Sequence, residues 1–359
     1  TRSGRTKDRI QAANLPADFA FDTGPVSHKV TLGYFGYWSK GWNTPYNPNT
    51  AYLGPYPRSA PTYVPEPKFP EDNSKPYYSG RSRNDNFVIG DQISIGDHVT
   101  AIIGVSRSEI FSRSFNAVGE SSRPDYEKGR WSPTYALSYK PVSWLTAYAS
   151  YIEGLEAGGT APLEATNARE IMPPMVSRQK EIGIKAELGG LLLTGALFDI
   201  SKAYEVLTDA GLYTQDGRQK DRGVELTATG RITEDLTIVG GFTMLDADVE
   251  GGDYDGLSPM NAARNWAKLY LEYDLPFAPG LTVTGGVYRT DKQWGNATNT
   301  DRLPAYTTFD LGARYVVPID DKALVLRLTV NNVADKTHWT NAYYVGQPRS
   351  VAFSAQFQF

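Results

Sequence analysis

The sequence predicts an all-β fold, a transmembrane antiparallel β-barrel, from three observations. Apolar and polar residues alternate along many stretches of the chain, as in strands with one apolar and one polar face. These stretches reach the length of about 9 to 11 residues that lets a tilted strand cross a bilayer. The connections between them alternate between short and long, so that one rim carries tight turns and the other carries long loops.

Period-two alternation predicts about fourteen strands. In NWAKLYLEYDL, Leu269 and Leu271 share one face, whereas Lys268, Tyr270 and Glu272 share the other. Charges in the middle of a strand are then expected to line a wet lumen, and the apolar residues are expected to face lipid. The predicted strands lie near residues 27–39, 84–95, 97–113, 129–140, 143–153, 178–188, 190–204, 223–231, 235–246, 262–275, 279–291, 306–317, 321–332 and 348–359.

The connections distinguish a barrel from a soluble sandwich, which produces the same alternation within a strand. Short turns are typical of the periplasmic rim of an outer-membrane barrel, and a sandwich has no reason to keep a strict order of short and long connections. The short ones lie at 95–98, 140–143, 188–190, 231–235, 276–280 and 317–320. The long ones lie at 40–83, 114–128, 154–177, 205–222, 247–261, 292–305 and 333–347.

The last predicted strand, SVAFSAQFQF, ends on an aromatic residue, Phe359. In a barrel this ring is expected to lie in the periplasmic aromatic girdle. The strand is expected to pair with the first strand of the barrel, because pairing removes the open edge.

Composition excludes several classes of protein. The formal net charge of the 359 residues is -4, so no basic field indicates a nucleic-acid partner. Cysteine is absent, which excludes thiolate metal sites and disulfide frameworks. No run of about 18 apolar residues predicts a transmembrane helix. The amino end, TRSGRTKDRI, lacks an apolar signal core, so we expect either a mature sequence that begins elsewhere or a fragment.

Several phrases in a fixed order resemble the carboxy-terminal barrel of TonB-dependent ferric-siderophore receptors. They include KGRWSPTYALSYKP at 128–141, LTAYASYIEGLEAGG at 145–159, LRLTVNNVADKTHW at 326–339 and GQPRSVAFSAQFQF at 346–359. The resemblance covers nearly everything from about residue 20 to 359. It implies an outer-membrane receptor of a Gram-negative bacterium that imports a ferric siderophore, energised by an inner-membrane complex through a TonB-type coupling protein.

The resemblance also implies parts that this sequence does not show. The family barrel is expected to have 22 strands, and its receptors carry an amino-terminal plug domain. With about fourteen strands visible, residues 1–359 are interpreted as a partial carboxy-terminal β-barrel domain, with the plug and the first barrel strands missing.

The predicted ligand-binding residues are aromatic side chains in or near the long loops. Flat rings can stack on a planar or amphipathic chelate, and nearby Arg or Lys would suit an anionic one. The alternative is that each ring belongs to the outer girdle or stiffens its loop. The candidates are Trp42, Tyr46, Tyr77, Tyr78, Tyr213, Trp294, Trp339, Tyr343 and Tyr344.

A weak calcium-loop candidate lies in LDADVEGGDYDG. Gly251 occupies the turn position of such a loop, but Leu257 stands where a bidentate Glu is needed. The alternative is a solvated acidic loop. Its acidic residues are Asp246, Asp248, Glu250, Asp253 and Asp255. No resident cofactor or histidine metal site is expected, because iron would arrive already chelated.

Two other functions compete with the receptor. A passive outer-membrane pore of about fourteen strands would explain the strand count without truncation. An outer-membrane hydrolase would also use a barrel with long loops, but the sequence has neither a GxSxG elbow nor an HExxH helix motif. The partners expected for the receptor are a ferric siderophore, the coupling protein through the missing plug, and outer-membrane lipid, with no nucleic acid.

Overall fold

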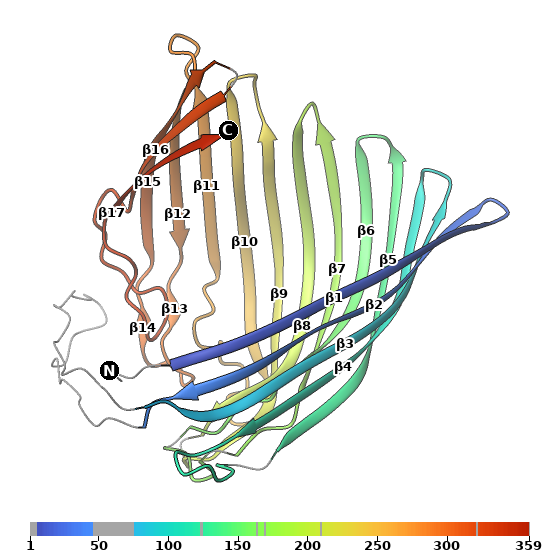
Figure 1. Ribbon diagram of the computed structural model, residues 1–359, viewed down its shortest axis with the longest axis vertical. Helices are drawn as coiled ribbons and strands as arrows, with labels where there is room; N and C mark the ends of the chain where they lie inside the picture. The colour runs from blue at the N-terminus through green and yellow to red at the C-terminus, as the bar shows by residue number, and fades with distance from the viewer. Residues whose placement is uncertain are drawn as a thin grey trace.

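The computed structural model describes residues 6–45, 75–122, 125–162, 164–168, 170–208, 210–320 and 322–358. Its main element is one antiparallel sheet of 15 strands, in which almost every strand pairs with its neighbours in sequence (Figure 1). The strands are β1 (Thr6–Thr23), β2 (Val26–Asn43), β3 (Tyr77–Ile95), β4 (Val99–Ser114), β5 (Tyr126–Val142), β6 (Leu145–Glu156), β7 (Met175–Leu188), β8 (Leu191–Leu207), β9 (Tyr213–Arg231), β10 (Leu236–Glu250), β11 (Asn265–Asp274), β12 (Leu281–Thr290), β15 (Tyr306–Ile319), β16 (Lys322–Asn331) and β17 (Ser350–Gln358). A separate short pair is formed by β13 (Gln293–Trp294) and β14 (Arg302–Leu303).

All fourteen predicted strands are present, and the sheet has one strand more than predicted. The additional strand is β1, which pairs along its whole length with β2. Pro16 lies in the middle of β1, and a proline at such a position is unfavourable in a strand that is paired on both sides. The structure places β1 at an edge of the sheet, where a residue without a backbone N–H is tolerated.

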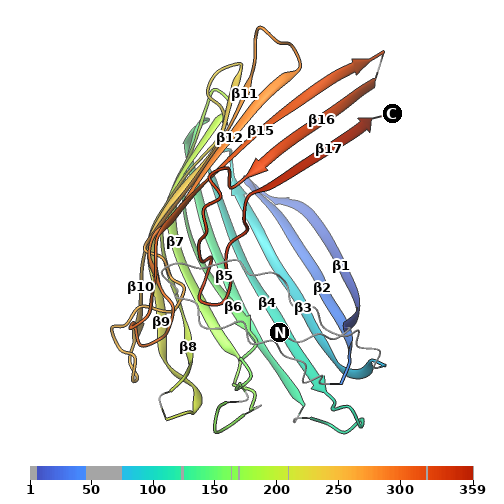
Figure 2. The ribbon, with the colours of Figure 1, turned by 90° about the vertical axis from the view of Figure 1, so that its left-hand side faces the viewer.

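The sheet curls into an open trough with β1 and β17 as its two edges (Figure 1, Figure 2). Among the described residues, β1 and β17 do not pair with each other. The predicted closure of the last strand on the first is therefore not seen, and Phe359 lies outside the described residues. No helix in the described part of the chain is long and apolar enough to span a membrane.

One face of the sheet carries the large apolar side chains, and register keeps them together across neighbouring strands. Leu269 of β11 lies opposite Gly240 of β10 and Val287 of β12, and Val287 lies opposite Phe309 of β15. We call this the outer face. Its side chains are exposed because no second sheet of the described chain packs on them: Leu226 is 51% exposed. Such a face needs hydrocarbon as its partner, as the alternation predicted.

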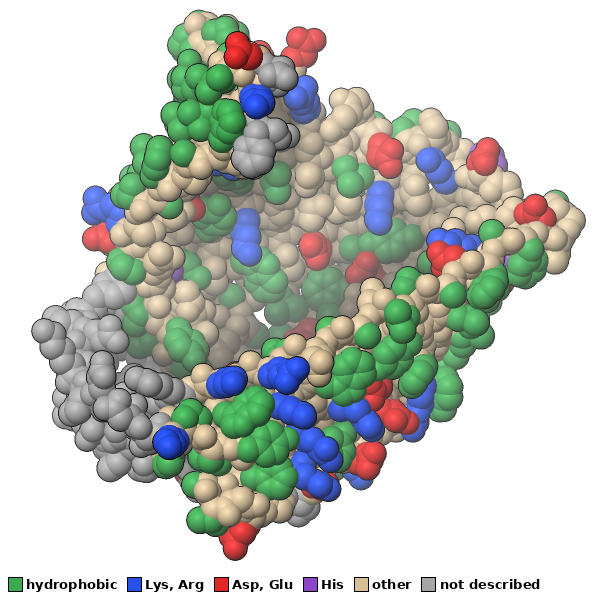
Figure 3. Space-filling view, in the orientation of Figure 1, with side chains coloured by type: hydrophobic (Ala, Val, Ile, Leu, Met, Phe, Trp, Pro, Cys, Tyr) green, Lys and Arg blue, Asp and Glu red, His purple; other side chains and the backbone are tan. Residues whose placement is uncertain are grey.

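The opposite face, here the lumen face, carries polar and charged side chains, with some exposed apolar ones such as Phe35 and Val239 among them. Lys268 and Glu272 lie on it and alternate along β11 with the outward-facing Leu269 and Leu271, and Arg314 forms an ion pair with Glu272 at 3.3 Å. Charged side chains are visible within the hollow of the trough in Figure 3. The compact buried cluster is small and lies at the loop rim, where Tyr204, Val206, Val249 and Tyr254 pack together. The fold is therefore held mainly by its ladder of strand pairs.

Short and long connections alternate as predicted, with one exception. The long ones gather toward the lower end of Figure 1, which we call the loop rim. The exception is the β8–β9 connection, which covers only 208–212 instead of the predicted 205–222. Strands β8 and β9 are 17 and 19 residues long, so they continue well past the length that a bilayer requires.

Candidate ligand-binding site

Three long connections pack against one another at the loop rim. They are the β10–β11 connection (251–264), the β12–β15 connection with its β13–β14 pair (291–305), and the β16–β17 connection (332–349). We call this assembly the loop platform. It joins segments that are far apart in sequence, because the antiparallel sheet brings every second connection to the same rim.

Hydrogen bonds hold the platform together. The backbone N–H of Asn261 donates to the carbonyl of Trp294 at 2.9 Å, and its side-chain Oδ1 accepts from the N–H of Ala342 at 2.7 Å. Gln293 is buried, with 6% of its surface exposed, and its side-chain amide N–H donates to the backbone carbonyl of Thr340 at 3.1 Å. Asn261 therefore links all three connections, and the platform is an ordered surface rather than three independent loops.

Four of the predicted aromatic residues come together on this platform. Tyr343 and Tyr344 are 69% and 68% exposed, at the tip of the β16–β17 connection. Trp339 forms an isolated bridge with Val345 at the base of that tip. Trp294 is partly buried in the β13–β14 pair, where the guanidinium of Arg302 lies 4.7 Å from its ring centroid. Two rings are thus presented to solvent, and two are built into the support.

His338 and Tyr306 form the support beneath the tip. The two rings pack at a tilt of 32° with centroids 4.1 Å apart, and His338 is 8% exposed. A Cβ on Gly346 would come within 2.0 Å of the imidazole, so glycine is required there for the chain to pass over the ring. This packing fixes the base of the β16–β17 connection, which carries Tyr343 and Tyr344.

The platform also carries one carboxylate with a shifted pKa. Asp291, just after β12, accepts a hydrogen bond from the Asn265 side chain at 3.1 Å, and this bond lowers the pKa of Asp291. Arg289 lies 3.7 Å from the same carboxylate. Asp291 is therefore held ionised by partners of its own and ties the start of the β12–β15 connection to β11.

Tyr213 lies elsewhere and has a scaffold role. Its phenol donates to Glu205 at 3.2 Å, and its backbone N–H donates to Asn167 at 2.9 Å. Glu205 also accepts the N–H of Gly159 at 2.9 Å. Tyr213 thus helps to attach the β6–β7 connection to β8 and β9 and does not join the loop platform.

Trp42 lies near the end of β2, and Tyr77 and Tyr78 begin β3, so these three residues flank the β2–β3 connection. Trp42 and Tyr78 are paired across the strands with ring centroids 5.7 Å apart, and Lys7 lies 5.4 Å from the Trp42 centroid. Trp42 occupies the outer-face register of β2, which suits a girdle residue. Tyr77 instead borders a depression of about 380 Å³ whose other lining includes Ser39. Tyr46 lies outside the described residues.

The acidic side chains of the calcium-loop candidate are not gathered into a site. Asp246, Asp248 and Glu250 lie along β10, and Glu250 is paired with Lys220 and Arg222 at 3.0 Å each. The other two, Asp253 and Asp255, follow in the turn. Among the described residues, no three His, Cys, Asp or Glu side chains form a group that could hold a metal ion. The geometry gives the calcium hypothesis no support.

Sequence reasoning missed the residues that build the platform. Asn261 and Gln293 are polar residues in polar loops, and nothing in their local sequence distinguishes them from solvated neighbours. In the structure Asn261 adopts a positive φ of 65°, and only its residue type points to this conformation. Asparagine is among the few non-glycine residues that take this conformation readily, so an Asn in a long loop is a candidate for a fixed turn.

The comparisons with known proteins agree with this architecture. The family model for TonB dependent receptor-like β-barrels matches residues 1–333. The ferrichrome receptor FcuA of Yersinia enterocolitica is 31% identical over 362 residues, covering 94% of this chain and 47% of that protein. A ferrioxamine receptor of the same species is 26% identical and covers 94% of this chain and 49% of that protein. The chain thus spans about half the length of the curated relatives it matches.

Solved structures show the same fold. The crystal structure of BauA, the ferric preacinetobactin receptor from Acinetobacter baumannii, has a TM-score of 0.76 and 28% identity, over 99% of this chain and 55% of that chain. The siderophore receptor PiuA from Acinetobacter baumannii has a TM-score of 0.73 at 21% identity, over 98% of this chain and 56% of that chain, and is alike in fold. The chain belongs to the TonB-dependent receptor β-barrel family of the Gram-negative outer membrane.

Proposed function

We propose that this chain is the barrel portion of a receptor that imports a ferric siderophore across the outer membrane. The observation that carries the proposal is the loop platform, which presents Tyr343 and Tyr344 above a supported base at the rim of the trough. The similarity to ferrichrome and ferrioxamine receptors supports a chelated ferric ion as the cargo. The same similarity supports energy input from an inner-membrane complex through a TonB-type coupling protein.

In this proposal the loops select the ligand and the barrel wall serves as their scaffold. Exposed rings contribute contact area to an iron chelate at a low cost in conformational entropy, because each has few rotatable bonds. The chelate already satisfies the iron, so the protein needs neither a metal ligand nor a resident cofactor. No bond is made or broken, and the proposal therefore includes no enzymatic activity and no nucleic-acid partner.

The proposal includes further strands and a plug outside these residues. Two open edges, β1 and β17, would leave unpaired backbone groups in lipid, at a cost of several kcal/mol for each group. A passive pore made by these 15 strands alone is disfavoured for that reason. The span of about half the length of the relatives agrees with a partial barrel.

Replacing both Tyr343 and Tyr344 with Ala in the receptor is expected to weaken binding of the ferric chelate by about tenfold or more. The physical reason is the loss of two exposed rings, each of which can contribute as much to the free energy of binding as a hot-spot residue does. Binding and uptake would be measured with radioactive iron in ferrichrome, ferrioxamine B and a catecholate chelate, under iron limitation.

The control is Tyr315→Ala, which removes a ring that is 45% exposed from the outer face. This variant is expected to leave affinity for the chelate unchanged. Surface abundance, measured by antibody on intact cells, separates loss of binding from loss of protein. Unchanged affinity of the Tyr343/Tyr344 variant for every chelate that supports growth would remove the platform from the binding site.

A further inference from the structure

A depression of about 380 Å³ opens on the lumen face of β2, β3 and β4 at the loop rim. Three of the serines that line it lie side by side: Ser39 of β2 is directly opposite Ser82 of β3, and Ser82 is directly opposite Ser112 of β4. We call these three residues the serine row. Ser39 has the same facing along β2 as Phe35, so the row belongs to the lumen face.

Two glycines and a β-bulge shape the depression beside the serine row. Gly41 lies directly opposite Gly80, so neither strand carries a side chain at this level. A Cβ on Gly80 would clash with the carbonyl oxygen of Arg113. The register shifts between Gly41 and Trp42, and Ser79 is the additional residue of the bulge. Bulges re-aim side chains, and the Ser79 hydroxyl lies 3.2 Å from where a Cβ of Gly41 would be.

Four hydroxyl groups of the depression have no partner in the described part of the chain. They belong to Ser39, Ser79, Ser82 and Ser112, and none of them forms a side-chain hydrogen bond there. A serine hydroxyl can donate one hydrogen bond and accept two. All four residues are half-buried rather than enclosed, so a ligand can reach their hydroxyls.

Several serines elsewhere on the lumen face provide a contrast. Ser138 donates to the carbonyl of Thr100 at 3.5 Å, and Ser108 donates to the side chain of Asn86 at 2.7 Å. Ser106 donates to a backbone carbonyl of β5 at 3.4 Å. The fold uses these hydroxyls for its own strand contacts, whereas those of the serine row remain available to a ligand.

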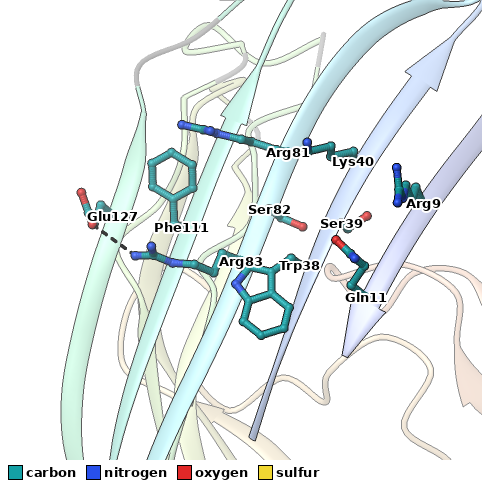
Figure 4. A pocket seen from close by; sticks show the side chains of 10 residues that line it. All are labelled: Arg9, Gln11, Trp38, Ser39, Lys40, Arg81, Ser82, Arg83, Phe111 and Glu127. Atoms are coloured by element: carbon teal, nitrogen blue, oxygen red, sulfur yellow. Dashed lines mark ion pairs between the residues drawn. The ribbon is translucent and has the colours of Figure 1, made fainter. Parts of the chain in front are cut away.

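The long cationic side chains of the same strands belong to the other face of the wall. Arg81 is directly opposite Lys40 and Arg113, and all three alternate with the serine row along their strands. Figure 4 shows Ser82 beside Arg81 on β3 and Ser39 beside Lys40 on β2. Because neighbouring residues of a strand point to opposite faces, these guanidinium and ammonium groups lie on the outer face and not in the depression.

Uncharged polar groups and one carboxylate complete the depression. Asn43 and Tyr77 lie directly opposite each other on its rim side. Asp8 of β1 is opposite Gly41, and its carboxylate lies 3.2 Å from where a Cβ of Gly41 would be. An anionic ligand would therefore meet a like charge here, and no cation among the described residues of the depression. An uncharged ligand with amide groups would find both donors and acceptors.

The loop platform adds no excess of positive charge. Its three connections carry five aspartates and five lysines or arginines, so their net charge is zero, and residues 340–347 at the tip are all uncharged. Arg302 lies over the Trp294 ring at 4.7 Å, and Arg349 lies 3.5 Å from Asp335. The platform and the depression lie at the same end of the trough, toward its two open edges (Figure 1, Figure 2).

We propose that the depression is a second contact surface for the imported chelate and that it selects a chelate without net negative charge. This inference rests on the proposed function and adds the charge class of the ligand. The serine row donates to carbonyl oxygens and accepts from amide N–H groups, so an uncharged ferric trihydroxamate with a peptide backbone fits it. A ferric tris-catecholate carries three negative charges, and nothing in the depression offsets the loss of their hydration.

The test compares two variants of the receptor, produced in the outer membrane and purified in mild detergent. One variant, S39A/S82A/S112A, removes the hydroxyls of the serine row. The matched control, S94A/S106A/S138A, removes three lumen-face hydroxyls that lie farther from the loop rim and contact the chain itself. Quenching of tryptophan fluorescence would measure binding of ferrichrome, an uncharged trihydroxamate, and of a ferric tris-catecholate, each at low and high salt.

The serine-row variant is expected to bind ferrichrome at least tenfold more weakly, because three hydrogen bonds to the ligand are lost. The control is expected to bind it as the unchanged receptor does. The unchanged receptor should bind ferrichrome at least tenfold more tightly than the tris-catecholate, and its affinity for ferrichrome should change little with salt. Heat-dependent migration in SDS gels checks that each variant is folded.

The outcomes separate this inference from the proposed function. Equal affinity of the serine-row variant and the unchanged receptor for ferrichrome would overturn the inference and leave the proposed function standing. Tighter binding of the tris-catecholate than of ferrichrome by the unchanged receptor would do the same. Failure of the unchanged receptor to bind any ferric chelate would overturn both.

Discussion

Replacing Leu226 with Arg is expected to lower the free energy of unfolding of the barrel by about 2 to 4 kcal/mol, the cost of a cation on the lipid face near the bilayer midplane. Leu226 lies between Gly195 and Phe242 on the outer face of β9 and is 51% exposed. In lipid, this side chain is surrounded by hydrocarbon, and an arginine there must be desolvated or must distort the bilayer. Urea titration of the receptor refolded in lipid vesicles would measure the change.

Glu225→Arg is the matched control for this experiment. Glu225 is the adjacent residue, is exposed and already charged, and occupies the lumen-face register of β9. An arginine there remains in water, so the free energy of unfolding is expected to change by much less than in Leu226→Arg. Equal destabilisation by the two variants would contradict the assignment of the faces.

Glu153→Ala is expected to give the second largest effect, a loss of about 2 kcal/mol in the free energy of unfolding. The Glu153 side chain is 9% exposed and joins three strands: it accepts from Arg130 of β5 at 3.0 Å and from Arg178 of β7 at 3.2 Å. Tyr151 donates to it at 2.6 Å. The estimate lies below the cost of breaking a fully buried ion pair because Arg130 and Arg178 are 42% and 47% exposed and can be rehydrated.

Glu153→Gln separates charge from shape. The amide retains one acceptor for Tyr151 or for an arginine, so a loss about half that of Glu153→Ala is expected. The same urea titration measures both variants. Hydrogen exchange should locate the change at the loop-rim ends of β5, β6 and β7. A Glu153→Ala variant as stable as the unchanged receptor would show that the three strands do not depend on this contact.

The face of the sheet on which each side chain lies could be predicted from the sequence. Side chains alternate between the two faces along every membrane-spanning strand, so one rule with a period of two residues applies to all of them. Leu269 lies on the outer face and Lys268 on the lumen face, as predicted. The rule failed where a strand leaves the bilayer. In β9 the stretch QDGRQKDR has polar residues on both faces, so the extension that begins at Tyr213 carries no alternation.

The gathering of rings in the loop platform could be predicted only in part. Trp294, Trp339, Tyr343 and Tyr344 were all among the candidate residues, and their connections do pack together. Which connections meet depends on the order of the strands and on hydrogen bonds from Asn261, and neither follows from local sequence.

The β2–β3 candidates show a different limit of sequence reasoning. The predicted strand stopped at residue 39, whereas β2 continues to Asn43. The extension carries Trp42 onto the outer face, beside Lys7. A residue assigned to a loop has no predicted face, so the sequence could not show that this ring turns away from the lumen.

Lipid quenching at single cysteines along β11 tests the central claim most directly. The 359 residues contain no cysteine, so a fluorophore can be placed at one position at a time from 267 to 272. Quenchers attached to lipid chains should strongly reduce emission at 267, 269 and 271 and leave emission at 268, 270 and 272 almost unchanged. Equal quenching at all six positions, or none at the odd ones, would show that the apolar face of this strand does not contact the bilayer.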